Sequence, residues 1–431
     1  MVTLLFVAGV LALCLFTGSM LGPMLASIGF TVIFFEFGGN TSIIANAIWN
    51  VFSSETLVAV PMFILLGELL SQSGLAQRIY GALSPTFERL PGKLLQSNVG
   101  TCTAFSAISG SSMATAAAVG AIAFRELEGR GYDRRPLIGS IAGAGALGML
   151  IPPSVMMVIY GSLMNVSIGS LFLGGILPGL MMAAIFMIYI GISTRLSPWT
   201  VPAGGTLVSA RAAFMAMLQA WPFLVLVFAI LGTIFLGLAT ATESAALGVA
   251  TVMILAALYR ELSVKTVWRA LRATAVTFGS LMLIIVSSII LTQATAITGM
   301  PEAVARFVAQ SGIPGWALLI LVYLLYFALG CVLDGLGMLL ITLPIIFPLV
   351  IGLGYDPVWF GIVLVMLMEI GMLTPPLGFN LFVLMAIARG TLGEVARACV
   401  PYWVLFLGGL ALVTLVPDIV LFLPRLFAGD S

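Results

Sequence analysis

Stretches of about 20 apolar residues follow one another along most of this 431-residue chain, with short polar connections between them. Each stretch is long enough to cross the hydrocarbon core of a bilayer, which is about 30 Å thick. The chain is 61% hydrophobic and 8% charged, whereas soluble domains carry about 25% charged residues. The longest polar connections, near residues 125–136, 193–213 and 259–272, are only as long as loops. The sequence therefore predicts an all-α polytopic membrane protein.

The composition also excludes several chemistries. The formal net charge is +1, which offers no basis for binding nucleic acid, and there is no histidine. Without histidine the chain has no zinc-protease motif, no Ser-His-Asp triad and no histidine proton relay. Asp334 is the only aspartate deep in an apolar segment, so the chain lacks the pair of aspartates of an aspartyl protease. The sequence also lacks the ATP-binding motif GxxxxGK[ST]. We predict that the chain is not an enzyme and holds no cofactor and no transition metal.

Arginine and lysine residues gather in five clusters along the chain. Basic short loops of membrane proteins face the cytoplasm. One topology puts all five clusters on that side, provided that segments 94–124 and 314–351 are re-entrant hairpins. Both termini then lie on the periplasmic side of a bacterial inner membrane. The clusters lie within residues 78–93, 125–135, 195–211, 260–272 and 389–397. The crossings, about 10 in number, are expected near residues 2–17, 20–37, 55–73, 137–164, 171–192, 214–236, 240–258, 273–291, 357–388 and 400–423.

The two halves of the chain contain an internal repeat. Residues 148–153 read GMLIPP and residues 371–376 read GMLTPP, and the same 223-residue offset pairs Ser111 in the first hairpin with Asp334 in the second. Each half has a hairpin, a short link and a helix interrupted by Pro-Pro, and the topology above inverts one half. Adjacent prolines free backbone carbonyls, which membranes tolerate only where the backbone is buried in protein or lines a cavity. Inverted repeats with paired broken helices are the sequence signature of alternating-access transporters.

The centre of the first hairpin is a run of helix breakers, residues 109–112. Their hydroxyls and exposed carbonyls are hard oxygen ligands that suit a small cation, and the neighbouring half-helix N-termini suit a carboxylate. A seam of small residues for helix packing would explain the alanines that follow, but not four breakers in a row. The centre of the second hairpin carries Asp334, and a carboxylate at membrane depth indicates a functional site.

Two sets of site residues follow. Sodium is the expected coupling ion because both hairpin centres are rich in oxygen and contain no histidine. The predicted sodium-binding residues are Ser109, Gly110, Ser111, Ser112, Pro152, Asp334, Gly335, Gly337, Thr374 and Pro375. The predicted substrate-binding residues are Ser111, Ser112, Ser154 and Asn380.

Other residues in apolar runs carry less specific signals. Glu243 and Glu369 each have two interpretations: a coupling carboxylate, or a buried carboxylate that bonds to a neighbouring helix end. Tryptophans near the predicted span ends, Trp359 and Trp403 among them, are interpreted as interfacial anchors.

These segments together resemble a known family, the large membrane subunit of TRAP (tripartite ATP-independent periplasmic) transporters, or DctM-like family. The resemblance extends over residues 50–415 and is carried by SGSSMATAAAVGAIAFRELEGRGYDRR, GALGMLIPPSVMMVIYGSLMNVSIGSLFLGGILPG, TATESAALG, LDGLGMLLITLPIIFP and MEIGMLTPPLGFNLFVLMAI. It implies an elevator transporter, similar to the divalent-anion/sodium symporters in its two re-entrant hairpins. It also implies a small membrane subunit and a soluble periplasmic binding protein that delivers a carboxylate. Because no four-helix extension precedes residue 1, we expect the small subunit to be a separate chain.

The expected function is sodium-coupled import of a small organic acid, with C4-dicarboxylates as one candidate class. The alternative is a self-sufficient sodium/anion symporter that binds its substrate without a binding protein. The expected units are scaffold helices in 1–93, transport repeat one in 94–192, scaffold and connecting helices in 193–313, transport repeat two in 314–399 and a C-terminal scaffold helix in 400–431.

Overall fold

The computed structural model of the chain describes residues 21–36, 38, 41–197, 201–202, 209, 211, 215–216, 218–299, 303, 306, 310, 312–376 and 378–428. Every regular element within these residues is a helix, which confirms the all-α prediction. The expected crossing near residues 2–17 lies outside the described residues.

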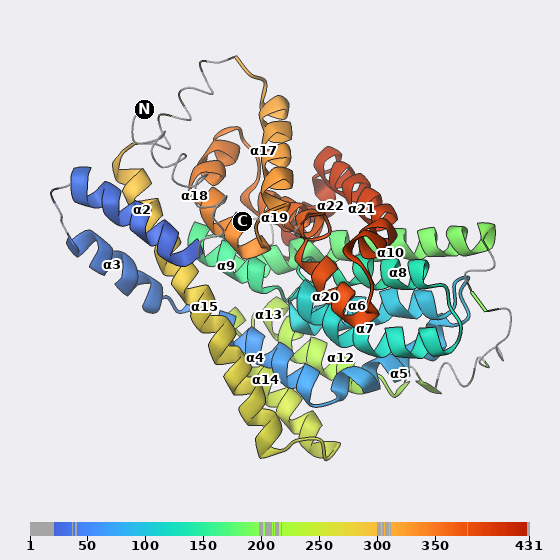
Figure 1. The fold of residues 1–431 in the computed structure, drawn as a ribbon. Helices are drawn as coiled ribbons and strands as arrows, with labels where there is room; N and C mark the ends of the chain where they lie inside the picture. Colours follow the sequence, from blue (N-terminus) through green and yellow to red (C-terminus); the bar gives the residue numbers. More distant parts are fainter. Residues whose placement is uncertain are drawn as a thin grey trace.

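One group of helices comes from the N-terminal part and the middle of the chain. The long helix α15 packs along α2, α3 and α4, and α14 also packs along α4 (Figure 1). α14 begins with a capping box, in which the Thr240 N–H donates to the Glu243 carboxylate at 2.8 Å. Glu243 is therefore an exposed cap of its own helix and not a buried carboxylate. The group comprises α2 (Leu21–Glu36), α3 (Thr41–Phe52), η1 (Thr56–Val58), α4 (Ala59–Gln72), α12 (Trp221–Val227), the π-helix η3 (Phe228–Gly232), α13 (Thr233–Phe235), α14 (Ala241–Leu258) and α15 (Val264–Ile297).

The first repeat has the predicted order of elements. A helical hairpin turns at Gly110 and Ser111, and a broken helix is interrupted between Ala146 and Ser154. α5 packs against the first arm of the hairpin, and the hairpin and the first half of the broken helix pack on each other. The helices are α5 (Leu75–Phe87), α6 (Leu94–Ser109), α7 (Ser112–Gly129), α8 (Arg134–Gly145), α9 (Val155–Met164) and α10 (Ile168–Leu196).

The second repeat reproduces this order. Its hairpin turns between Gly330 and Gly335, and its broken helix is interrupted between Met372 and Phe379. The C-terminal helices pack mainly on the repeats: α21 lies against α8, α10 and α19, and α22 lies against α10. The helices are α17 (Gly315–Gly330), α18 (Gly335–Gly352), α19 (Pro357–Met372), α20 (Phe379–Ala388), α21 (Leu392–Leu415) and α22 (Asp418–Ala428).

Two hydrogen bonds show that the broken helices run in opposite directions. Arg134, at the start of α8, donates to the carbonyl of Ala388, at the end of α20, at 2.5 Å. Tyr160, near the end of α9, donates to the carbonyl of Pro357, at the start of α19, at 2.7 Å. Each broken helix therefore begins beside the end of the other, as the inverted repeat predicts.

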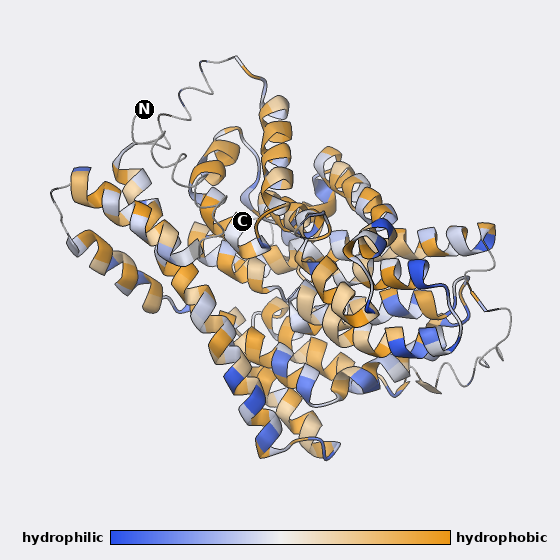
Figure 2. Ribbon diagram, in the orientation of Figure 1, coloured by the Kyte–Doolittle hydropathy of each residue, from blue (hydrophilic) through white to orange (hydrophobic). Residues whose placement is uncertain are grey.

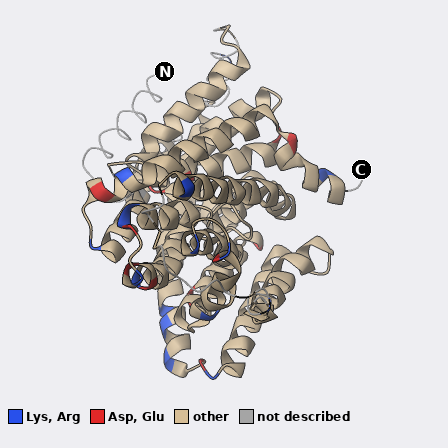
Figure 3. Cartoon of the chain, turned by 90° about the vertical axis from the view of Figure 1, so that its right-hand side faces the viewer, with Lys and Arg blue, Asp and Glu red and all other residues tan. Residues whose placement is uncertain are grey.

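The basic clusters lie together at one end of the helices. Figure 2 shows hydrophilic residues at the lower end of α14 and α15 and at the right-hand ends of α5 to α8, and Figure 3 shows Lys and Arg at helix ends. Four contacts connect the five clusters, so the structure agrees with placing them all on one face. These contacts are Arg78 with Glu261 at 2.6 Å, Arg130 with Glu88 at 3.2 Å, Lys93 with the carbonyl of Pro202 at 3.0 Å, and Arg134 with Glu394 at 3.4 Å.

By length and composition, five of the described helices can cross a membrane, or six if the bent pair α3–α4 forms one span. The two halves of a broken helix are shorter. α8 has 12 residues and α9 has 10, so at about 1.5 Å per residue neither reaches across a core about 30 Å thick. A crossing at this place needs both halves, which is consistent with the expected broken crossing near residues 137–164.

Candidate functional site

The turn of the first hairpin, which we call tip one (residues 109–112), is built by a glycine and two serines. Gly110 ends α6 with a φ of +60°, and Ser111 caps α7 by accepting a hydrogen bond from the Ala114 N–H at 3.4 Å. The hydroxyls of Ser109 and Thr115 lie 2.8 Å apart. Because glycine adopts this left-handed conformation without strain, the sequence folds into a tight turn at this point.

Tip one packs directly on the interruption of the first broken helix, which we call break one (residues 146–154). A Cβ added to Gly110 would lie 2.7 Å from the carbonyl oxygen of Pro153. A Cβ added to Gly148 would lie 2.6 Å from the carbonyl oxygen of Ser111 and from the backbone of Ser112. The two irregular backbones thus touch in two places, and only glycine allows so close an approach. The structure therefore brings the predicted residues of tip one and of the first Pro-Pro together.

Glu369 connects this site to the second repeat. It lies on α19 and is 0% exposed. Its Oε1 accepts hydrogen bonds from the Ser112 hydroxyl and, at 3.1 Å, from the Met149 N–H. The sequence leaves both interpretations of Glu369 open: it places Glu369 two residues before GMLTPP but does not reveal its partner Ser112 in the first repeat.

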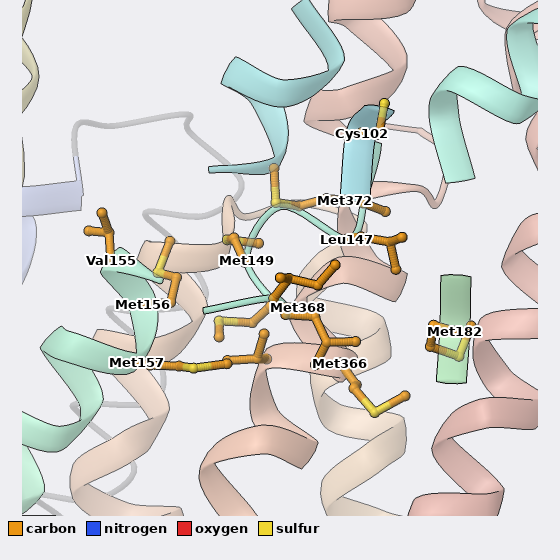
Figure 4. Close-up of a cluster of buried hydrophobic side chains, with 14 of the residues drawn as sticks. Cys102, Leu147, Met149, Val155, Met156, Met157, Met182, Met366, Met368 and Met372 are labelled. Carbon is orange, nitrogen blue, oxygen red and sulfur yellow. The ribbon is translucent and has the colours of Figure 1, made fainter. Parts of the chain in front are cut away.

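The turn of the second hairpin, which we call tip two (residues 331–337), lies near the same place. Asp334 caps α18, and its Oδ1 accepts a hydrogen bond from the Gly337 N–H at 3.2 Å. A Cβ added to Gly335 would lie 3.6 Å from the terminal methyl groups of both Met149 and Met156. Tip two therefore contacts break one and the start of α9 through methionine side chains. Figure 4 shows Met149, Met156 and Met368 close together in this buried cluster, and their flexible, polarisable side chains can repack when neighbouring elements move.

The interruption of the second broken helix is hydrogen-bonded to a tryptophan side chain. The Thr374 hydroxyl donates to the carbonyl of Ile370 at 2.6 Å and accepts from the Trp403 indole N–H at 2.9 Å. The polar atom of the half-buried Trp403 thus has its partner inside the protein. Trp359 is not the expected interfacial anchor, because it is 1% exposed and donates to the carbonyl of Val413 at 3.0 Å.

Two predicted substrate-binding residues keep free polar atoms. Ser154, after the first Pro-Pro, and Asn380, after the second, are fully buried. Neither the Ser154 hydroxyl nor the Asn380 amide has a hydrogen-bond partner among the described residues. Asn380 is the second residue of α20, which packs along α7. Since buried polar groups are normally hydrogen-bonded, these two side chains are available to a polar ligand.

The arrangement has the chemistry of an ion and anion site inside a membrane. Hydroxyls, freed carbonyls and the carboxylates of Asp334 and Glu369 are oxygen ligands of the kind that hard cations prefer. The N-termini of α7, α9 and α20, which follow tip one and the two interruptions, favour negative charge. An all-helical membrane protein with two inverted hairpins and two broken helices belongs to the class of secondary transporters.

Comparison with known proteins gives the family. Residues 8–419 match the family described as "Tripartite ATP-independent periplasmic transporter, DctM component", and the chain belongs to this family. It is thus a large permease subunit of a TRAP transporter, a multi-pass membrane protein and not an enzyme. Such a permease works with a small membrane subunit and a periplasmic binding protein.

Named relatives differ in their substrates and in their length. The C4-dicarboxylate TRAP transporter large permease protein DctM of Pseudomonas aeruginosa is 35% identical over 86% of each chain. The sialic acid TRAP transporter large permease protein SiaM of Vibrio cholerae is 32% identical over 87% of each chain. The isethionate TRAP transporter permease protein DctMQ of Oleidesulfovibrio alaskensis is 32% identical over 90% of this chain and 60% of its own length. Among solved structures, the YdaH transporter of Alcanivorax borkumensis has a TM-score of 0.61 at 13% identity over 88% of each chain, which supports the fold alone.

Proposed function

We propose that the chain is the membrane permease of a sodium-coupled transporter that imports a small organic acid across the bacterial inner membrane. The observation that carries the proposal is the contact between tip one and break one. It concentrates the Ser109, Ser111 and Ser112 hydroxyls beside the carbonyls freed by Pro152 and Pro153. Carbonyls of unwound backbone and half-helix ends are the usual ligands of coupling ions in such transporters.

Sodium and substrate would use neighbouring parts of this site. Tip one with Pro152 forms one candidate sodium site. Asp334, Gly335, Gly337, Thr374 and Pro375 form the other. Ser111, Ser112, Ser154 and Asn380 then face the carboxylate, and the unpartnered Ser154 hydroxyl and Asn380 amide support that assignment. The substrate class follows from the helix starts, which favour an anion, and C4-dicarboxylates are the first candidates because the P. aeruginosa relative bears that name.

The small subunit is proposed to be a separate chain. The DctMQ relative matches this chain over only 60% of its own length, so a fused partner would account for the remainder. A periplasmic binding protein would deliver the substrate to the face opposite the basic clusters, which we place in the cytoplasm because basic short loops face that side. Both termini would then be periplasmic.

The mechanism is proposed to be an elevator movement. The two hairpins and the two broken helices contact each other closely, and α2, α3, α4, α14 and α15 form a second group of contacts. Freed carbonyls and Asp334 are costly to expose to lipid, so a unit that carries both tips keeps them covered. The packing of α21 and α22 on the repeats leads us to group them with this moving unit, in place of the C-terminal scaffold helix expected from the sequence.

The test is uptake by proteoliposomes that contain the permease, its small subunit and the candidate binding protein. An inward sodium gradient should drive uptake of a small organic acid, chosen from a panel that begins with C4-dicarboxylates, and a proton gradient alone should not. Uptake that follows the proton gradient and ignores sodium would overturn the coupling. Sodium-driven uptake without any binding protein would favour the self-sufficient symporter.

A further inference from the structure

Glu369 is a carboxylate in a place where an isolated negative charge is costly. It is fully buried, and none of the ion pairs between described residues includes it. Its Oε1 accepts from the Ser112 hydroxyl and the Met149 N–H. Its Oε2 is buried and accepts no hydrogen bond from any described residue. Because a buried carboxylate is stable only when a proton or a cation neutralises it, this second oxygen has an open place for one or the other.

The surroundings of Glu369 suit a cation better than they suit a basic side chain. The two groups that bind Oε1 are neutral, so they orient the carboxylate without cancelling its charge. The neighbours in the buried cluster, Met149 and Met368 among them, are apolar (Figure 4). The Ser112 hydroxyl supplies a further oxygen atom beside the carboxylate, and the carbonyl oxygen of Pro153 lies against Gly110 of the same tip. A small hard cation prefers such a set of oxygens.

We infer that Glu369 is both a ligand and a positioning residue of the coupling cation. Oε2 binds the cation, and Oε1 holds tip one and break one in place around it. The inference rests on the proposed function, because it adds a ligand for the same ion. The inference goes beyond the proposed function because it makes α19 of the second repeat a part of the cation site of the first repeat. The shared cation then gives a physical reason for the two repeats to move together, since separating them would uncover a buried charge.

The test compares the wild type with Glu369→Gln in thermal unfolding of the purified full-length chain in detergent. Each protein is measured in sodium chloride and in choline chloride at equal ionic strength. Glutamine keeps the shape of glutamate, and its oxygen still accepts from Ser112 and Met149, but it carries no charge. Without sodium, the variant should be at least as stable as the wild type, because its side chain is already neutral and needs neither a proton nor a cation. The sodium concentration that gives half of the thermal stabilisation should be at least tenfold higher in the variant.

Glu243→Gln is the matched control. It makes the same chemical change at an exposed helix cap, where glutamine also completes a capping box. Its sodium response should equal that of the wild type.

The outcomes separate this inference from the proposed function. An equal sodium response in the wild type and in Glu369→Gln would overturn the role of Glu369 and leave sodium coupling standing. A wild type that does not respond to sodium would overturn the coupling itself, and the cation ligand with it. A Glu369→Gln protein that is less stable than the wild type without sodium, or that does not fold, would contradict the charge argument and leave Glu369 a structural role.

Discussion

Replacing Gly148 with alanine tests the contact on which the candidate site depends. The added Cβ would lie 2.6 Å from the carbonyl oxygen of Ser111 and from two backbone atoms of Ser112, whereas ordinary contacts are 3.4–4 Å. Tip one and break one would have to separate by about 1 Å. Since all three obstructing atoms are backbone, no side-chain rotation relieves the contact.

The size of the effect follows from the cost of overpacking. An extra methyl group in a well-packed interior costs about 1–3 kcal/mol. If tip one moves away from break one, the Ser112 hydroxyl can no longer donate to Glu369, and the cost reduces the affinity of the cation site. A loss of 1–3 kcal/mol in binding corresponds to about 5- to 150-fold weaker cation affinity. We expect Gly148→Ala to lower the thermal stability of the purified protein and to raise the sodium concentration needed for half-maximal uptake within that range.

Gly279→Ala is the control for this prediction. Gly279 lies in α15, and an added Cβ there would meet nothing within 4 Å. Alanine in a helix interior is favoured over glycine by about 1 kcal/mol, so this variant should be as stable as the wild type or more stable, with unchanged sodium dependence. If Gly148→Ala behaves like Gly279→Ala in both measurements, close packing of tip one on break one is not needed for transport, and the reasoning fails.

Three further predictions concern the tip, the topology and the movement. Ser111→Ala and Ser112→Ala should reduce uptake at limiting sodium, and Ser112→Ala more strongly, because its hydroxyl also donates to Glu369; wild-type uptake by both would leave only backbone carbonyls as ligands. Cysteines introduced at Arg130 and Lys265 should react with membrane-impermeant reagents from the cytoplasmic side alone, and labelling of either from the periplasm would contradict the proposed orientation. A reversible disulfide between α6 and α12, which lie in contact, should stop transport until it is reduced; full turnover with the disulfide in place would favour a rocking or gated mechanism.

The sequence by itself determined the class of this protein and the order of its elements. Apolar stretches of membrane-spanning length, basic loops and runs of Gly, Ser and Pro are local signals, and each acts through backbone conformation or transfer into lipid. They placed both hairpins and both interruptions. The repeated GMLIPP and GMLTPP segments revealed the repeat, and the basic clusters predicted an inversion that the Arg134–Ala388 and Tyr160–Pro357 contacts support.

Only the tertiary structure decided which side chains complete the site. Ser112 and Glu369 are 257 residues apart in the chain, and no pattern in the sequence near either residue shows that they are partners. The same limit explains the error at Trp359, which lies near a predicted span end but is buried and donates to a carbonyl inside the protein. Packing of distant helices sets burial and hydrogen-bond partners, whereas local sequence sets where a helix begins, breaks and ends. The sequence left Glu369 of α19 with two interpretations, and only the packing of the two repeats against each other brings its carboxylate to Ser112 and Met149.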